Sequence, residues 1–448
     1  MKIFLVNRSW LYRIHRWVSL LCAAFFLLLC ITGLPLLFKD EIATWNIVTE
    51  MPEHMADYAD LWNALPSGKL QLSQQYPQKV IKAISADAEK GQLLFRVENP
   101  GELQPDHARM KMGGQQLGFD PTSNIIFDHT HVAVKYPLVT SFMHWMHILH
   151  LRLGLGQEGM MFLGLFCALS AGSIFSGLIL YWPMMTKISW GTIRNFSKCL
   201  FLADSHKFIG MIAGIWSLVL CISGTMIVVF SIGYGSYLHT IEMQGNQYFS
   251  KLPSGGSQRS FSEAMRWIQQ TYPDRNLLSV EYPEQGKNYY AFYLTPDKAT
   301  KEDFMGQKVL LNGFDATDFF YTQPLPKYLL IAAVFLNFHI HNHPTLFLKM
   351  LWLCYLILTM GTIISGLWIY FEKKRKKPIK KVHITLQRRN NLPGLDSAWK
   401  WPTAIFIFSI IGLIAPLLSN PDGIIIAEVA LSLPLLSCLV ILKKQHKV

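Results

Sequence analysis

Charged residues are scarce in this chain of 448 residues. They make up 16% of the sequence, while apolar residues make up 51%; a soluble globular domain carries about 25% charged residues. This composition excludes a disordered chain and argues against a soluble enzyme. The net charge of +12 would suit a nucleic-acid-binding protein, but the positions of the basic residues indicate a membrane protein instead.

Cysteine is absent from two long stretches of mixed polarity, at about 40–145 and 235–328. All seven cysteines lie in apolar runs or in a short basic loop: Cys22, Cys30, Cys167, Cys199, Cys221, Cys354 and Cys438. The two stretches therefore hold no disulfide framework, although an oxidising compartment would allow one.

Several catalytic motifs are also missing from the sequence, among them the P-loop, the Ser-centred nucleophile elbow, HExxH and CxxC. Residues 154–159 match GxGxxG, but they precede an apolar run and follow no strand of a βαβ unit. We interpret this match as accidental. The chain therefore has no site of its own for a nicotinamide cofactor.

Six apolar runs are long enough, or nearly so, to cross a bilayer, which requires ~20 residues. They are 17–38, 160–182, 208–232, 346–371, 402–419 and 424–442. The first lacks a cleavage site with small residues and is interpreted as a retained anchor, not as a signal peptide.

Basic residues set the expected orientation of these spans. Of the 41 Lys and Arg residues, 21 lie at the N-terminus, in 187–207, in 372–401 and at the C-terminus. Because such residues stay on the cytoplasmic side, we expect both termini in the cytoplasm and the stretches 40–145 and 235–328 outside. We assign the basic run that starts at Lys373 to anionic lipid headgroups, not to a nucleic acid.

The sequence repeats itself. His15-Arg16-Trp17 and Cys30-Ile31-Thr32-Gly33 recur 191 residues later as His206-Lys207-Phe208 and Cys221-Ile222-Ser223-Gly224. His150 and Ser176-Gly177-Leu178 recur 189 residues later as His339 and Ser365-Gly366-Leu367. We therefore predict two copies of one unit, in which a span, an outward α+β lobe and a second span follow each other.

The predicted fold class is an α-helical membrane protein with six spans. Its first four spans belong to the duplicated unit, and a C-terminal helical hairpin follows. The expected boundaries are an N-terminus and first span at 1–39, a first lobe at 40–145, a second span at 146–183, a cytoplasmic loop at 184–205, a third span at 206–234, a second lobe at 235–328, a fourth span at 329–371, a basic cytoplasmic segment at 372–401 and the hairpin at 402–448.

The repeat selects four of the fifteen histidines. His15 and His206 lie at the cytoplasmic ends of spans one and three, while His150 and His339 precede spans two and four on the outer side. Histidines at membrane depth are costly and usually functional, and two imidazoles from facing helices are the ligands of a six-coordinate haem. We therefore predict two haem b groups per chain, one for each pair.

Four repeated glycines lie at the expected depths of these histidines. Gly33 follows His15 by 18 residues, ~27 Å along a helix, and the others are Gly177, Gly224 and Gly366. A porphyrin edge can pack against the backbone where no side chain is present. Ordinary packing of helices through small residues is an equal alternative.

Other histidines are weaker candidates for iron ligands. His144 and His147 precede His150, while His341 and His343 follow His339. These four side chains either contribute to the outer site or are interfacial. Asp128, His129 and His131 suggest a metal site, but a surface loop is the better interpretation.

These motifs resemble the PepSY-associated transmembrane family over about 10–372. The family has a His followed by a basic and an aromatic residue at the head of a span, then Thr-Gly or Ser-Gly near its end. Phe119-Asp120-Pro121-Thr122 is similar to the strand-turn signature of a PepSY lobe. The resemblance implies a multi-pass protein of a bacterial inner membrane with both lobes in the periplasm, similar to haem-containing ferric-siderophore reductases.

We therefore hypothesise an oxidoreductase that conducts electrons across the membrane through two haems. An unknown cytoplasmic or quinol donor supplies the electrons, and a periplasmic ferric siderophore accepts them and releases Fe(II), which hard oxygen ligands bind more weakly. Candidate aromatic residues for docking the chelate are Trp45, Trp62, Trp145, Tyr234 and Tyr321. Two alternatives are a transporter of iron or siderophore, and a non-enzymatic regulator of the PepSY type.

Overall fold

The chain forms two compact units in the computed structural model. A helical unit contains Met1–Ala43, Leu138–Ser231 and Ile331–Val448, and a sheet unit contains Thr44–Pro137 and Ile232–Leu330. The structure describes residues 8–48, 55–99, 115–128, 134–185, 191–251, 257, 259–283, 288–295, 306–314, 320–340, 345–375, 395–418 and 421–445.

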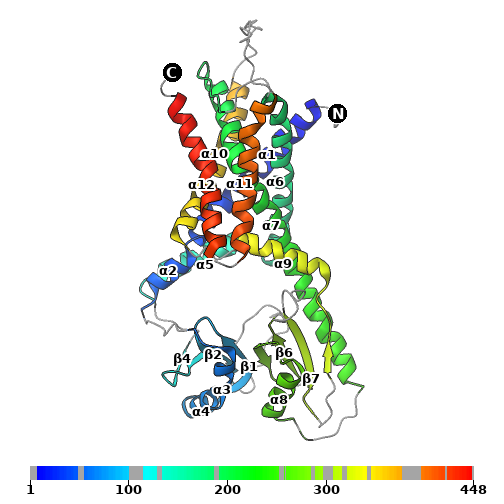
Figure 1. Ribbon diagram of the computed structural model, residues 1–448. Coiled ribbons are helices and arrows are strands. Elements are labelled where there is room, and N and C mark those ends of the chain that lie inside the picture. Colours follow the sequence, from blue (N-terminus) through cyan, green and yellow to red (C-terminus); the bar gives the residue numbers. More distant parts are fainter. Residues whose placement is uncertain are drawn as a thin grey trace. The chain divides into compact units, whose positions relative to one another are not determined.

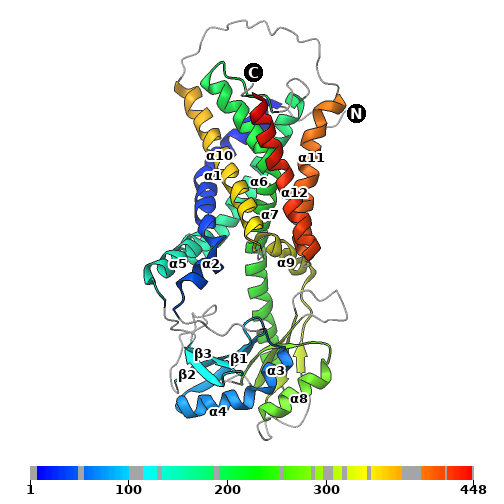
Figure 2. The same cartoon turned by 60° about the vertical axis from the view of Figure 1, so that its left-hand side comes forward.

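Long apolar helices run side by side in the helical unit (Figures 1 and 2). Within the described ranges, five helices are long and apolar enough to cross a membrane: α1 (Arg8–Leu36), α6 (Gly156–Met185), α7 (Lys198–Phe249), α10 (Leu346–Arg375) and α12 (Pro421–Gln445). We expected six spans. The sixth corresponds to α11 (Leu395–Ile414), whose apolar part, Lys400–Ile414, falls among the shorter apolar helices. The protein is thus a mostly helical membrane protein with an added sheet.

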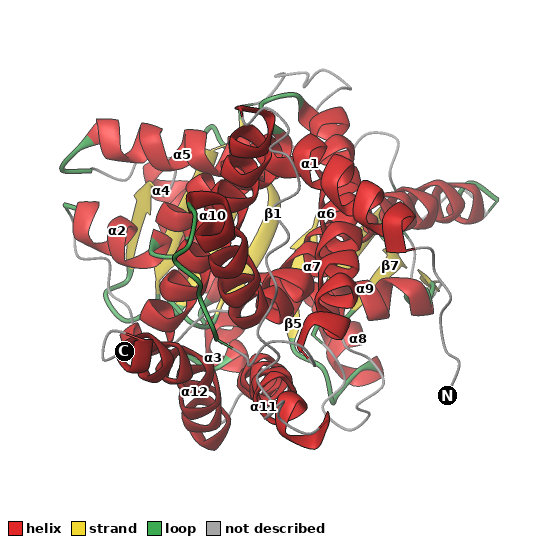
Figure 3. Ribbon diagram, turned by 90° about the horizontal axis from the view of Figure 1, so that it is seen from above, coloured by secondary structure: helices red, strands yellow, loops and turns green. Residues whose placement is uncertain are grey.

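Four of these helices form a ring. Helix α1 packs against α6 and α10. Helix α7 is hydrogen-bonded to both of the same helices, because Thr225 donates to the Gly164 carbonyl of α6 at 3.4 Å and Ser217 pairs with Thr359 of α10 at 2.7 Å. Helices α1 and α7 therefore lie on opposite sides of the ring. Helices α11 and α12 lie together at one side of the bundle (Figure 3), where the Tyr355 hydroxyl of α10 donates to the Leu431 carbonyl of α12 at 3.0 Å.

The second and fourth expected spans are each broken into two helices. Helix α5 (Pro137–Arg152) precedes α6, and α9 (Lys327–Ile340) precedes α10. At the first break, Leu153, Gly154 and Gly156 adopt positive φ angles of 53°, 74° and 66°, which ends a helix. A Cβ added at Gly159 would lie 1.9 Å from the Arg152 carbonyl oxygen. The GxGxxG match is therefore a tight turn between two helices.

Two helices, α5 and α7, extend beyond the boundaries that we expected for them. Helix α5 starts at Pro137, so residues from Leu138 onward belong to the helical unit and not to the first lobe, which we expected to reach residue 145. Helix α7 has 52 residues, although we expected a span at 206–234. It contains no proline, the residue that most strongly interrupts a helix. A short helix that we did not predict, α2 (Lys39–Asn46), follows α1.

The sheet unit contains a single eight-stranded sheet in which every pair of neighbouring strands is antiparallel. Strands β1 to β4 come from the first expected lobe and β5 to β8 from the second, in the order β4-β3-β2-β1-β5-β6-β7-β8. The strands are β1 (Val80–Asp87), β2 (Gln92–Glu98), β3 (Gln115–Asp120), β4 (Ile125–Asp128), β5 (Leu277–Glu281), β6 (Tyr289–Leu294), β7 (Gln307–Asn312) and β8 (Phe320–Thr322).

The centre of the sheet has a twofold pattern. Strand β1 pairs with β5 so that Ile84 faces Val280, Ala83 faces Glu281 and Ser85 faces Ser279. Ile84 and Val280 stand 196 residues apart, the same spacing that separates Tyr76 from Tyr272. Equivalent residues therefore meet at the centre of the sheet, as they do across an isologous interface.

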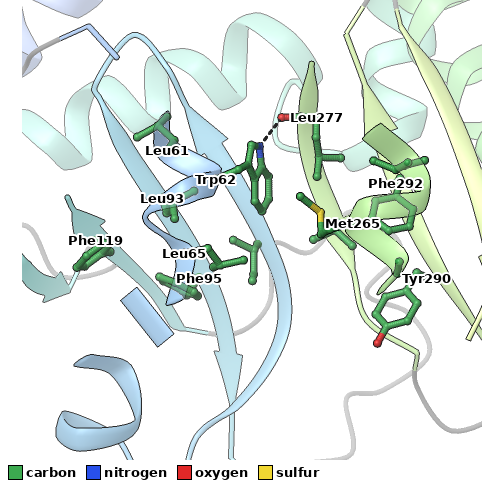
Figure 4. Close-up of a cluster of buried hydrophobic side chains, with 14 of the residues drawn as sticks. Leu61, Trp62, Leu65, Leu93, Phe95, Phe119, Met265, Leu277, Tyr290 and Phe292 are labelled. Carbon is green, nitrogen blue, oxygen red and sulfur yellow. Dashed lines mark hydrogen bonds between the residues drawn. The ribbon is translucent and has the colours of Figure 1, made fainter. Parts of the chain in front are cut away.

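Helices pack on this sheet over a shared apolar core (Figure 4). They are α3 (Tyr58–Asn63), α4 (Leu65–Gln75) and α8 (Phe261–Thr271). Helices α4 and α8 both have 11 residues and end at similar caps, Tyr76 with φ −132° and ψ 58° and Tyr272 with φ −129° and ψ 63°. The Trp62 indole donates to the Leu277 carbonyl at 2.8 Å and so joins α3 to β5.

Candidate functional site

The four repeated histidines lie in the helical unit, each beside a hydroxyl residue of a neighbouring helix. His15 of α1 donates from Nδ1 to the Ser173 carbonyl of α6 at 2.9 Å, with Ser176 Oγ at 3.2 Å. A carbonyl oxygen can only accept, so the proton of neutral His15 is on Nδ1. Ser176 is also an acceptor here, because its own hydroxyl donates to the Ser173 carbonyl at 2.7 Å.

His206 repeats this arrangement on the opposite side of the ring. Its Nδ1 donates to the Thr362 carbonyl of α10 at 3.0 Å, and Ser365 Oγ lies at 3.1 Å. The Ser365 hydroxyl donates to the Thr362 carbonyl at 2.9 Å, as the Ser176 hydroxyl does to its own helix. His15 and His206, which we call the inner pair, therefore have the same tautomer.

His150 of α5 and His339 of α9, the outer pair, are hydrogen-bonded to hydroxyl groups of α1 and α7. Thr32 Oγ1 lies 2.9 Å from His150 Nδ1 and donates its own proton to the Leu28 carbonyl at 2.8 Å. Ser223 Oγ lies 3.0 Å from His339 Nδ1 and donates to the Leu220 carbonyl at 3.0 Å. With their protons on these carbonyl groups, both hydroxyl groups accept from Nδ1–H.

The shared tautomer leaves Nε2 of all four imidazoles without a proton. A neutral imidazole with a bare nitrogen is a metal ligand, and a hydrogen bond at the other nitrogen fixes the ring orientation and raises ligand basicity. Each of the four histidines therefore has, at Nδ1, the hydrogen-bond partner that a metal-binding imidazole requires.

The outer pair also has a spacing that fits one metal ion. The ring centroids of His150 and His339 are 6.2 Å apart, and the rings are tilted by 48°. An imidazole nitrogen binds a metal at ~2.0–2.1 Å and lies about 1.1 Å from its ring centroid, so two imidazoles on opposite sides of one ion have centroids ~6.2 Å apart.

The four glycines of the repeat lie against these imidazoles. A Cβ added at Gly177 would lie 2.9 Å from His15 Cε1, and one at Gly366 would lie 3.1 Å from His206 Cε1. Gly33 and Gly224 face the outer pair in the same way, at 3.1 Å from His150 Cε1 and 3.6 Å from His339 Cε1. The glycines thus provide space for the histidine rings themselves, and a contact with a porphyrin edge stays a prediction.

A cavity of about 700 Å³ surrounds the inner pair, within the range of cofactor sites. His15, His206, Gly177 and Gly366 all line it. Most of its other walls are apolar, and its basic lining residues are Arg8, Arg16, Lys207, Lys373 and Lys374.

Of the weaker histidine candidates, the structure describes only His144 and His147. His144 and His147 are exposed on α5. Across the described ranges, no group of three or more His, Cys, Asp or Glu side chains could hold a metal ion. His129, His131, His341 and His343 lie outside the described residues.

A sequence model of the PepSY-associated TM region matches residues 12–373. The chain belongs to this family. A comparison with curated proteins gives no match. The PepSY-associated TM match extends from α1 to α10, so it includes all four histidines and their hydroxyl partners, while α11 and α12 lie beyond it.

Sequence reasoning missed some residues of this PepSY-associated TM protein and misassigned others. It overlooked the acceptors of the inner pair, although Ser173 and Ser176 recur after 189 residues as Thr362 and Ser365. It also assigned Trp62 to chelate docking. Trp62 is 7% exposed and is hydrogen-bonded inside the sheet unit (Figure 4), so it supports the fold.

Proposed function

We propose that this protein conducts electrons across a bacterial inner membrane through two haem b groups and reduces a periplasmic ferric siderophore. The observation that supports this function is the shared setting of four histidines: Nδ1 of each lies within hydrogen-bond distance of an acceptor group on a neighbouring helix, which leaves Nε2 for a metal. His15 with His206 would hold one haem, and His150 with His339 the other. A bound haem supplies one-electron transfer between its two iron oxidation states.

In this proposal, carbonyl and hydroxyl groups of the chain orient the four imidazoles. The carbonyl groups of Ser173 and Thr362 orient the inner imidazoles, and the hydroxyl groups of Thr32 and Ser223 orient the outer ones. Residues 15 and 33 of α1 stand 18 positions apart, so ~27 Å separates the two levels. The pairs thus lie near opposite surfaces of a bilayer whose hydrocarbon core is ~30 Å thick.

We also propose the duplication, the sixth span in α11 and the cytoplasmic location of both termini. The matched helices α4 and α8, the meeting of Ile84 with Val280 and the two equivalent histidine pairs support the duplication. The basic segments support the orientation, since the start of α1 and the ends of α10 and α12 lie at one end of the bundle (Figure 2). Reporter fusions after residues 90 and 377 would test it, with the first outside and the second inside.

A spectrum of the purified full-length protein tests the proposed function. We expect a low-spin haem b spectrum with about two haems per chain. When the protein is reduced and mixed with a ferric hydroxamate siderophore, the haem should reoxidise while a ferrous-specific chelator captures Fe(II). A colourless protein from haem-replete cells would reject the conduit and favour the transporter or the regulator.

A further inference from the structure

The cavity around the inner pair has an unbalanced charge. Its described lining contains five basic residues and no Asp or Glu. Arg16 and Lys207 are half-buried, and Arg8, Lys373 and Lys374 are exposed. Like charges gathered around one cavity repel each other and attract an anion, so an anionic group is the expected partner of these residues.

The basic residues of the cavity are not equivalent. Lys207 of α7 donates to Asp204 at 3.0 Å, and Asp204 also accepts from Arg194 at 2.8 Å. Lys207 is thus already paired with an acid, which it shares with Arg194. Arg13 of α1 stands where the repeat places Asp204 in α7, 191 residues later, so α1 lacks the matching acid.

Arg16, the repeat equivalent of Lys207, lines the same cavity directly after His15. Its guanidinium carbon lies 5.0 Å from the ring centroid of Trp17. Its Nε is buried and has no hydrogen-bond partner among the described residues. A buried N–H without an acceptor is destabilising, so Arg16 has a donor available for a ligand in the cavity.

We propose that Arg16, together with Arg8 and Lys373 on the same wall, binds the carboxylates of the inner haem. The inference rests on the proposed function. Haem b is an apolar macrocycle with two propionate groups, which matches a mostly apolar cavity with cations on one wall. A guanidinium pairs with a carboxylate in a planar, charge-assisted geometry.

This binding has a redox consequence. A cation beside the haem favours the ferrous form, which carries one positive charge fewer than the ferric form, and so raises the reduction potential. Arg16 is in this sense a positioning and tuning residue, and its loss should change the potential as well as the affinity for haem.

The test uses full-length protein in which His150→Ala and His339→Ala are combined, so that both proposed outer ligands are removed and we expect only the inner haem to remain. The haem-depleted protein is titrated with haem or with haem dimethyl ester, whose carboxylates are neutral. In this parent, Arg16→Gln should weaken haem binding about tenfold and lower the midpoint potential. Lys207→Gln, the matched control, should change affinity by less than about twofold because Lys207 is already paired with Asp204.

Comparing haem with its ester isolates the interaction between Arg16 and the haem carboxylates, in the way that a double-mutant cycle isolates the interaction of two residues. With the ester, the parent and Arg16→Gln should bind equally well, while Arg16→Lys should keep most of the potential with natural haem. An equal loss with haem and ester would mean a damaged fold and would overturn the proposal. So would an unchanged affinity for haem combined with loss of co-purifying anionic lipid, which would identify a lipid phosphate as the anion.

The outcomes also separate the two proposals. A parent protein that takes up no haem would reject the proposed function itself. A parent that binds haem while Arg16→Gln and Lys207→Gln behave alike would reject only the role of Arg16.

Discussion

The inner and outer histidine pairs share a tautomer but differ in their surroundings. The inner imidazoles have a backbone carbonyl as their nearer partner and line a cavity of about 700 Å³ whose mostly apolar lining includes five basic residues. Each outer imidazole donates to a hydroxyl group, and the two ring centroids are 6.2 Å apart. The two copies of the repeat thus supply the same imidazole ligands to both pairs, while helix ends and loops determine what surrounds each pair.

The largest expected effect separates the pairs completely. Replacing His15 or His206 with Ala should remove one haem of the two, because a bis-imidazole site rarely retains haem with one ligand missing. The double replacement should remove no more than either single one, since the two residues act as a unit. Haem per chain, from the pyridine haemochrome, measures this. Additive losses for the two replacements would show that they serve different haems.

The outer pair should lose the other haem, but less completely. His150→Ala and His339→Ala should each leave the inner haem in place. His341 and His343 stand within four residues of His339, so they offer substitute ligands at the outer site. Haem content and the ligand-field spectrum of the His339→Ala protein would measure the substitution. Complete loss of the outer haem would mean that neither neighbour reaches the iron.

A smaller effect is expected from the space beside the rings. Gly177→Ala adds a Cβ 2.9 Å from His15 Cε1, whereas Gly172→Ala, on the same helix, meets nothing within 4 Å. Displacing the ring by overpacking costs about 1–3 kcal/mol, so inner haem affinity should fall roughly tenfold or more for Gly177→Ala. The Gly172→Ala protein should titrate like the unaltered one. Equal haem titrations of the two variants would show that the contact between residue 177 and the His15 ring does not affect haem binding.

Several of these features could be predicted from sequence because their patterns are local or repeated. Strands β5 and β6 lie in the second lobe, which we expected to be α+β, and the repeat alone selected the four histidines. The break at Leu153 was not predicted, although Gly154 and Gly156, which readily adopt positive φ angles, stand beside it. The pairing of β1 with β5 was also out of reach, since local patterns do not specify which edges of two lobes meet.

The hydroxyl groups of the site show the same limit. Thr32 and Ser223 belong to recognised motifs, yet nothing in the motif says that their oxygens accept from His150 and His339. That role depends on where α5 and α9 turn back toward α1 and α7, which the breaks before α6 and α10 determine. Residue types alone thus predicted the ligand chemistry of the site, while the hydrogen-bond partners of the histidines could be identified only from the fold.

The smallest expected effect tests the difference between carbonyl and hydroxyl support with one substitution in both pairs. Ser223→Ala removes the hydroxyl 3.0 Å from His339 Nδ1, while Ser365→Ala removes one at 3.1 Å from His206 Nδ1. His206 keeps its nearer partner, the Thr362 carbonyl at 3.0 Å, so its ring orientation should persist. Loss of a group that orients a ligating histidine typically weakens metal binding about 10–100-fold. We therefore expect about a tenfold loss of outer haem affinity for Ser223→Ala and under about threefold loss of inner affinity for Ser365→Ala, both from haem titrations. If Ser365→Ala proved the more damaging change, the hydroxyl and not the carbonyl would be the group that holds the inner imidazole.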